Sequence, residues 1–158
     1  MSVEDRLAEL GLELPEVVAP LASYLPAVLN GSYVYTSGQL PITKGELAET
    51  GKVGAEVTPE RAAELAEICA LNAIAAIKSV VGDLSRVKRI VKVVGFVASS
   101  PDFYGQPAVV NGASELLGAV FGDAGKHARS AVGVAVLPRN APVEIEVIAE
   151  CSGARGLD

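Results

Sequence analysis

Several residue types are scarce in this chain of 158 residues, and each scarcity excludes a class of protein. There is no tryptophan, and only 3 Phe and 4 Tyr occur, which disfavours a platform for stacking single-stranded RNA. Acidic residues (19) outnumber basic ones (13), and the net charge of −6 argues against a general nucleic-acid binder. No uninterrupted apolar run reaches about 18 residues, so neither a transmembrane helix nor a membrane partner is expected.

Cysteine and histidine are also rare. Cys69 and Cys151 are too few for a disulfide framework, no cluster has the spacing of zinc ligands, and we expect no metal. We expect Cys69 to pack as a small hydrophobic side chain. The only histidine, His127, is expected to lie in a loop and to point to the face opposite Arg129 rather than to act as a general base. The acidic N-terminus lacks an apolar segment, which predicts no signal peptide and a cytoplasmic location.

Half of the residues are hydrophobic, chiefly Val, Ala, Leu and Ile, which fits a single domain over residues 1–158. Turn and capping residues divide the chain into elements. The expected elements are a short helix from Ser2 to Gly11, an extended segment over 12–20, a hairpin over 24–29 and 32–37 with an Asn30-Gly31 turn, a loop over 43–57, a helix over 58–81, a strand over 87–98, a helix over 107–121, and strands over 128–137 and 143–150. After the first helix the order is β-β-α-β-α-β-β, which predicts an α+β fold with two helices packed on one face of a mixed sheet.

Residue alternation in the last two strands predicts which side chains face the helices. We expect the valines of both strands to pack on the helices, so that Arg129 and Glu144 point to the helix-free face. The central strand over 87–98 is apolar on both sides, so that face needs cover. We therefore expect a partner subunit there, and a pocket at the interface.

Arg129 and Glu144 are the main candidates for chemistry. The guanidinium fork of Arg129 matches a carboxylate, and the small residues after it leave room for a ligand, although an interface salt bridge is the more common role of such an arginine. Glu144, in a half-buried apolar pocket, would have a raised pKa and could relay protons to or from water. Alternation alone does not choose between Glu144 and Glu146. Weaker candidates, because they are polar groups near the ends of elements, are Tyr24, Ser37 and Asn111.

Three segments resemble the YjgF/RidA family. Residues 33–41 (YVYTSGQLP) resemble its hairpin strand, residues 128–138 (ARSAVGVAVLP) its C-terminal signature, and residues 143–149 (VEIEVIA) its final strand. The resemblance covers residues 17–150, preceded by a helix and an extended segment over 1–16, and suggests a less-studied branch of the family. It implies a chorismate-mutase-like fold and a homotrimer with three pockets between subunits. It also implies hydrolysis of reactive 2-enamine or 2-imine acids, such as 2-aminoacrylate, to 2-keto acids and ammonia, without a cofactor.

The same resemblance assigns roles to single residues. It implies that Arg129 holds the carboxylate of a small metabolite and that Glu144 positions the water. The remaining pocket positions of the family fall on Tyr24, Ser37, Gly38 and Asn111. The chain departs from the family pattern at Ala131, where the family has cysteine, and at Lys126-His127, where it has Phe-Pro. Both departures leave the identity of the substrate open.

Two other functions stay open. An endoribonuclease, an activity attached to the family under the name L-PSP, or a translation inhibitor is disfavoured by the net charge, the scarce aromatics and the lone histidine. A small basic rim at Lys88, Arg89 and Lys92 is the feature that leaves it open. A non-enzymatic module could instead bind 2-keto acids through Arg129.

Overall fold

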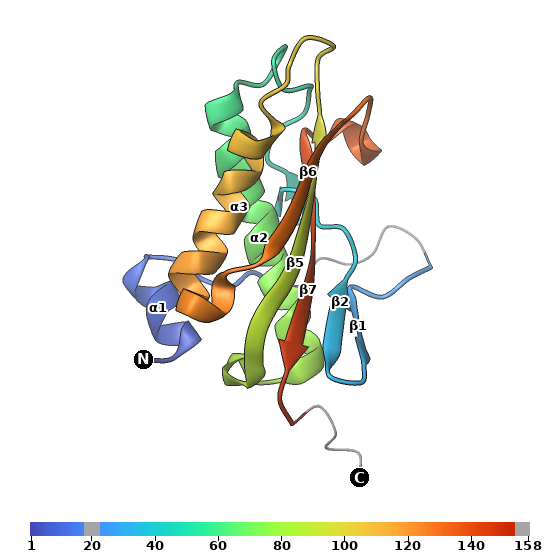
Figure 1. Ribbon diagram of the computed structural model, residues 1–158. Coiled ribbons are helices and arrows are strands. Elements are labelled where there is room, and N and C mark those ends of the chain that lie inside the picture. The colour runs from blue at the N-terminus through green and yellow to red at the C-terminus, as the bar shows by residue number, and fades with distance from the viewer. Residues whose placement is uncertain (18–22, 154–158) are drawn as a thin grey trace.

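A mixed five-stranded sheet carries both long helices on one of its faces (Figure 1). The computed structural model describes residues 1–17 and 23–153. In spatial order the strands are β1 (Ala27–Asn30), β2 (Tyr33–Thr36), β7 (Val143–Cys151), β5 (Val87–Ala98) and β6 (Ala128–Val134). Neighbouring strands are antiparallel except β5 and β6, which are parallel. The arrangement confirms the predicted α+β fold.

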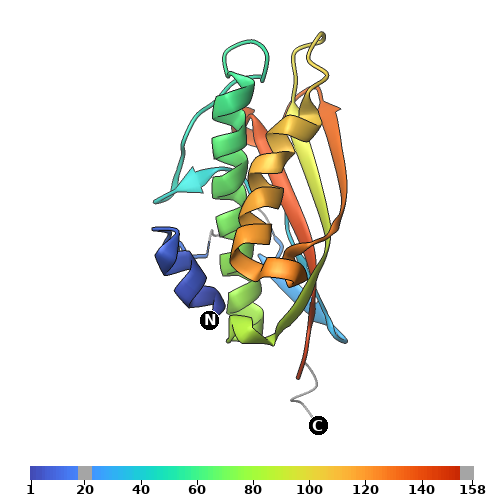
Figure 2. The ribbon, with the colours of Figure 1, turned by 60° about the vertical axis from the view of Figure 1, so that its left-hand side comes forward.

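The second layer consists of α2 (Pro59–Val81), which packs on β1, β2 and β7, and α3 (Gln106–Phe121), which packs on β5 and β6. The far face of the sheet carries none of the described α-helices (Figure 2). Helix α2 begins and ends at the predicted residues. The Thr58 side chain accepts a 3.1 Å hydrogen bond from the backbone N–H of Arg61, and Gly82, with φ 84°, ends the helix in a conformation that favours glycine.

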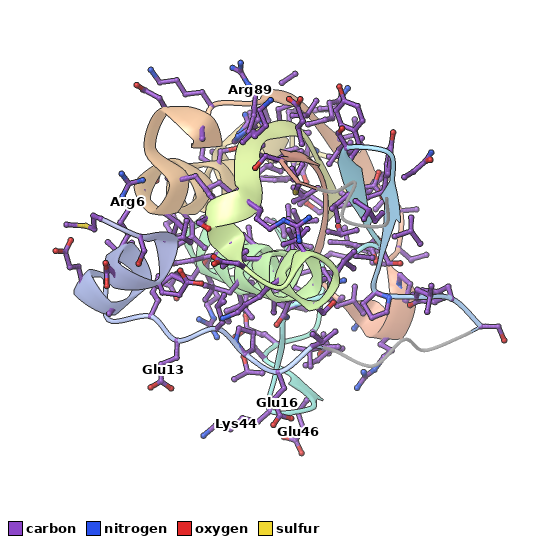
Figure 3. All side chains as sticks on the ribbon, turned by 90° about the horizontal axis from the view of Figure 1, so that it is seen from below. Arg6, Glu13, Glu16, Lys44, Glu46 and Arg89 are labelled. Atoms are coloured by element: carbon purple, nitrogen blue, oxygen red, sulfur yellow. The ribbon has the colours of Figure 1, made fainter. Side chains whose placement is uncertain are left out.

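The N-terminal helix α1 (Val3–Glu9) is also present, with Ser2 and Asp5 forming a reciprocal capping box. Arg6, labelled in Figure 3, donates from Nη1 to the carbonyl oxygen of Val120, in the last turn of α3. The hydrogen bond is 3.2 Å long. Leu7 is buried in the main core. Helix α1 therefore docks on the helix layer. None of the described helices is long and apolar enough to cross a membrane.

Two turns differ from the prediction. The hairpin between β1 and β2 turns at Gly31 and Ser32, one residue later than expected, because Asn30 still pairs with Tyr33. Of these two turn residues only Gly31, with φ 62°, has a positive φ. The expected loop over 43–57 contains most of a small hairpin made of β3 (Ile42–Thr43) and β4 (Glu46–Leu47).

The end of β6 and the extended segment near the N-terminus can also be compared with the prediction. Strand β6 ends at Val134, short of the predicted residue 137, and a short helical turn follows at Pro138–Asn140. The expected extended segment over 12–20 is free of helix and strand over 12–17, and its last part lies outside the described residues.

Alternation predicted the faces of one of the last two strands and not of the other. In β7, Val143, Ile145 and Val147 are buried in the core beneath the helices, as predicted. In β6 the prediction was wrong, because the side chain of Val132 is 42% exposed, whereas Ala131 packs against the core.

The close approach of α3 to the sheet explains the reversal in β6. A Cβ atom on Gly133 would lie 2.7 Å from Nε2 of Gln106, at the start of α3. On the adjacent strand β5, a Cβ atom on Gly95 would lie 2.3 Å from a methyl group of Val110. At these two positions the helix side of the strands therefore has no room for a valine, and Val132 turns outward. Arg129 shares the face of Gly133 and so points toward α3, not to the helix-free face as expected.

Candidate active site

Arg129 lies near the start of β6, an edge strand of the sheet, and its guanidinium reaches helix α3. Nη1 donates a hydrogen bond of 2.7 Å to Oδ1 of Asn111 and one of 3.2 Å to Oγ of Ser114. The two acceptors are three residues apart on α3, so they lie on the same face of the helix. Arg129 and Asn111, which were each predicted as site residues, are therefore in direct contact.

These contacts leave one edge of the guanidinium open. A guanidinium Nη1 has two hydrogens, and both have acceptors on α3. Among the described residues, Nε and Nη2 of Arg129 have no hydrogen-bond partner, and the residue has no ion pair. Two parallel N–H groups of this kind are the donor set that a carboxylate accepts bidentately.

Sequence reasoning missed two residues of this cluster. His127 is half-buried and places Nε2 2.9 Å from Oγ of Ser114 and Nδ1 2.6 Å from the carbonyl oxygen of Gly125. It therefore lies on the side of Arg129, and the prediction that it points to the opposite face was wrong. The signal was present, because residues 127 and 129 are two apart along an extended segment and Ser114 is one helical turn after Asn111.

A second group of predicted residues gathers where the chain leaves β2. Gln39 and Ile145 exchange backbone hydrogen bonds of 2.8 and 3.0 Å, which hold the segment after β2 against β7. Gly38 consequently faces Glu144 so closely that a Cβ atom on Gly38 would lie 2.7 Å from Cδ of Glu144 and 2.8 Å from Oε2. Glu144, rather than Glu146, is therefore the carboxylate beside Gly38.

Ser37 connects this group to the segment that contains Tyr24. The Ser37 hydroxyl donates to the carbonyl oxygen of Leu25, and its backbone N–H donates a 2.8 Å bond to that of Pro26. Tyr24, with 46% of its surface exposed, directly precedes these two residues. Gly38 and Glu144 thus lie side by side, Ser37 directly precedes Gly38, and Tyr24 directly precedes the segment to which Ser37 is bonded.

The surroundings of Glu144 work against its ionisation. Burial, the larger cause, raises the pKa of the Glu144 carboxyl, and the negative charge of Glu146 raises it further. Cys69 is fully buried beneath this region, and burial raises the pKa of its thiol well above the ordinary value. The thiol is therefore a packing group of the core, as predicted, whereas Glu144 is only partly buried.

The two groups of residues do not meet within one chain. Glu144 lies opposite Phe96 of β5 on the helix-free face, whereas Arg129, Asn111 and the half-buried Ala131 lie on the helix side, at the edge strand. The expectation that Arg129 and Glu144 share a face was wrong, because the close approach of α3 turns Val132 outward and Arg129 toward the helix. A single copy of the chain therefore holds Arg129 and Glu144 in two separate groups, on opposite sides of the sheet.

Comparison with known proteins identifies the family. Residues 4–151 match a family described as "YjgF/chorismate mutase-like, putative endoribonuclease". The chain belongs to the YjgF/RidA family. This confirms the family and the fold that the three sequence segments indicated.

Several YjgF/RidA relatives are similar over most of the chain. "Protein TCP17" of Trypanosoma cruzi is 44% identical over 149 residues, which cover 94% of this chain and 93% of that protein. The 2-iminobutanoate/2-iminopropanoate deaminase of Escherichia coli (strain K12) is 36% identical over 131 residues, 83% of this chain and 89% of the deaminase. A crystal structure of a protein of unknown function from Agrobacterium tumefaciens has a TM-score of 0.89 and 48% identity, and covers 95% of this chain and 92% of that one.

Proposed function

We propose that this protein hydrolyses reactive 2-imine and 2-enamine acids to 2-keto acids and ammonia, without a cofactor. The observation that carries the proposal is the guanidinium of Arg129, whose Nη1 is held by α3 while Nε and Nη2 have no partner among the described residues. That open edge suits the carboxylate that all such substrates carry. The name of the E. coli relative supports the same chemistry, since 2-iminobutanoate and 2-iminopropanoate are both 2-imino acids.

In this proposal Arg129 binds and Glu144 moves protons. The ionised Glu144 carboxylate accepts a proton from a water whose oxygen attacks the imine carbon, and the imine nitrogen takes up a proton from solvent, which gives a carbinolamine. The C–N bond then breaks, the proton on Glu144 leaves with the ammonia, and the hydroxyl returns its proton to solvent to become the keto oxygen. Imine and water thus give keto acid and ammonia. An enamine such as 2-aminoacrylate first tautomerises to the imine.

We further propose that the pocket forms between copies of a homotrimer, with Arg129 of one copy opposite Glu144 of the next. The helix-free face supports this, because it exposes 41–46% of the surface of the apolar or aromatic residues Val28, Tyr33, Tyr35 and Val132. Three of these residues, Val28, Tyr33 and Tyr35, lie on the paired strands β1 and β2, and exposed apolar surface gathered in this way marks a site of association. A three-fold ring brings the edge of one copy to the face of the next, so one contact could complete each pocket.

The test measures keto-acid release from 2-aminoacrylate that a serine dehydratase generates in the assay, with semicarbazide to trap the free imine. Wild-type protein should accelerate release, and Arg129→Ala should abolish the acceleration by raising KM. Arg61→Ala is the matched control, because Arg61 lies on α2 and pairs with Glu49 and Glu64. Wild-type protein that does not accelerate release contradicts the proposal for this substrate.

A binding module for 2-keto acids is the alternative, and Glu144→Gln separates it from the enzyme. A hydrolase should lose most of its kcat in this variant and keep its affinity for pyruvate, measured by calorimetry. Wild-type protein that binds pyruvate through Arg129 but accelerates no imine hydrolysis would establish the module instead.

A further inference from the structure

His127, Ser114 and Arg129 form a chain of hydrogen bonds whose direction can be worked out from the atoms. The carbonyl oxygen of Gly125 can only accept, so Nδ1 of His127, 2.6 Å away, must carry the hydrogen. In a neutral imidazole the other nitrogen is then an acceptor. The contact of 2.9 Å between Nε2 and Oγ of Ser114 therefore has the serine hydroxyl as its donor.

Once the Ser114 hydroxyl donates to His127, only the lone pairs of its oxygen remain for other groups. They accept the 3.2 Å hydrogen bond from Nη1 of Arg129. Every bond in the chain thus donates in the same sense, from Arg129 to Ser114 to His127 to Gly125, and such chains polarise and strengthen one another. A serine without the histidine would be free to turn its hydrogen toward the guanidinium.

The far end of the chain is fixed by packing. Gly125 is buried, and a Cβ atom on it would lie 2.3 Å from the carbonyl oxygen of Leu117 on α3. The Gly122–Gly125 turn is therefore pressed against the helix that carries Ser114. Gly125, which accepts the hydrogen bond from His127, and Ser114, which His127 contacts, are therefore held in fixed positions relative to each other.

We propose that Ser114 and His127 are positioning residues for Arg129, which hold its Nη1 on α3 so that Nε and Nη2 are presented to the carboxylate of the ligand. The His127 ring acts through Ser114 and does not touch the ligand. The inference rests on the proposed function for the identity of the ligand, but the orientation of Arg129 can be tested without any substrate.

The first test is spectroscopic, and the single histidine of the chain makes its signals unambiguous. In ¹⁵N NMR spectra near neutral pH, His127 should carry its hydrogen on Nδ1 and have an unprotonated Nε2. The Nε–H signal of Arg129, assigned by its loss in Arg129→Lys, should show an ordered side chain in ¹⁵N relaxation. An Nε2-protonated ring in the wild-type protein would overturn the proposal.

Substitutions of Ser114 and His127 test whether His127 acts on Arg129 through Ser114. Ser114→Ala and His127→Phe should each make Arg129 mobile, whereas Ser114→Thr keeps the hydroxyl and should leave Arg129 ordered. Because His127 acts through Ser114, the double variant should be no more mobile than Ser114→Ala alone. Additive effects, or an Arg129 that stays ordered in Ser114→Ala, would contradict the proposal.

The kinetic readout connects positioning to the substrate. Ser114→Ala and His127→Phe should raise KM for the imino acid roughly fivefold, the effect of one hydrogen bond, and leave kcat nearly unchanged. Ser114→Thr should restore the wild-type KM. If the wild-type protein neither binds pyruvate nor hydrolyses the imine, the proposed function fails, and the two NMR results still decide whether Ser114 and His127 position Arg129.

Discussion

At the scale of single residues, the surroundings of Glu144 fit the proton-transfer role that we propose for it. Alternation along β7 fixes its face, and the bridge between Gln39 and Ile145 sets Gly38 against its carboxyl group. Partial burial then makes the charged form less favourable than it is in the unfolded chain. A carboxyl group in this state holds a proton more tightly and releases it at a higher pH, which suits a group that must both accept and return protons.

The raised pKa of Glu144 predicts a pH-dependent stability. An acid with a higher pKa in the folded than in the unfolded chain binds more proton when folded, so the contribution of Glu144 to the free energy of unfolding falls as the pH rises above about 4.5, the ordinary glutamate pKa. Glu144→Gln has no proton to lose. The variant should therefore match the wild type at low pH and be more stable than it at neutral pH, as measured by urea unfolding from pH 4 to 8. A wild type at least as stable as Glu144→Gln at pH 7 would contradict this; the exposed Glu16→Gln is the control.

At the scale of elements, α2 and α3 approach each other closely at Gly112. A Cβ atom there would lie 1.9 Å from the carbonyl oxygen of Ala63 on α2, a backbone atom that cannot move aside. Gly112 directly follows Asn111 and lies two residues before Ser114, so the helix crossing and the anchor of Arg129 share the same turn of α3. The spacing of the helix layer thereby determines where the guanidinium lies.

We expect Gly112→Ala to push the helices apart and to cost roughly 1–3 kcal/mol of unfolding free energy or more, the usual cost of overpacking. Gly118→Ala on the same helix is the control, because a Cβ atom there meets nothing within 4 Å. The control should be neutral or stabilising, since alanine is the better helix former. The measurement is the urea midpoint of unfolding, which should be lower for Gly112→Ala than for Gly118→Ala. Equal midpoints would show that the space between α2 and α3 at Gly112 can accommodate a methyl group.

The same crossing explains which parts of the site the sequence could predict. In β7, large apolar residues alternate with acids, so only one assignment of faces is reasonable and Glu144 was placed correctly. In β6, Val alternates with Ala and Gly, and both faces are apolar. The choice between them depends on how near α3 lies to Gly95 and Gly133, a long-range property that no local pattern contains. The contact of Ser114 with His127 depends on the same packing.

At the scale of the whole molecule, the separation of Arg129 from Glu144 becomes the main constraint on function. One copy holds the two groups on opposite faces of one sheet. If each pocket combines Arg129 of one copy with Glu144 of another, activity belongs to the assembly and not to the chain. Dissociation of the assembly into single copies should then abolish turnover although each copy remains correctly folded.

Mixing two inactive variants tests this arrangement. Arg129→Ala and Glu144→Gln should each be inactive alone, but after co-refolding in equal amounts about a quarter of the pockets should receive both intact residues, which restores about that share of wild-type turnover. Mixing without subunit exchange is the control and should restore nothing. Absence of recovery in co-refolded trimers would place both residues of the pocket in one copy.

The position of Gly38 against Glu144 has a consequence for how such a protein can diverge. Gly38 has no positive φ, so its backbone does not require glycine; the neighbouring carboxyl group does. While selection maintains Glu144, larger residues at position 38 displace the carboxyl group and are eliminated. Once a lineage loses the acid, that barrier disappears and position 38 can drift. Glycine at 38 and glutamate at 144 should therefore be inherited as a pair, and descendants that keep only the binding arginine should have lost both.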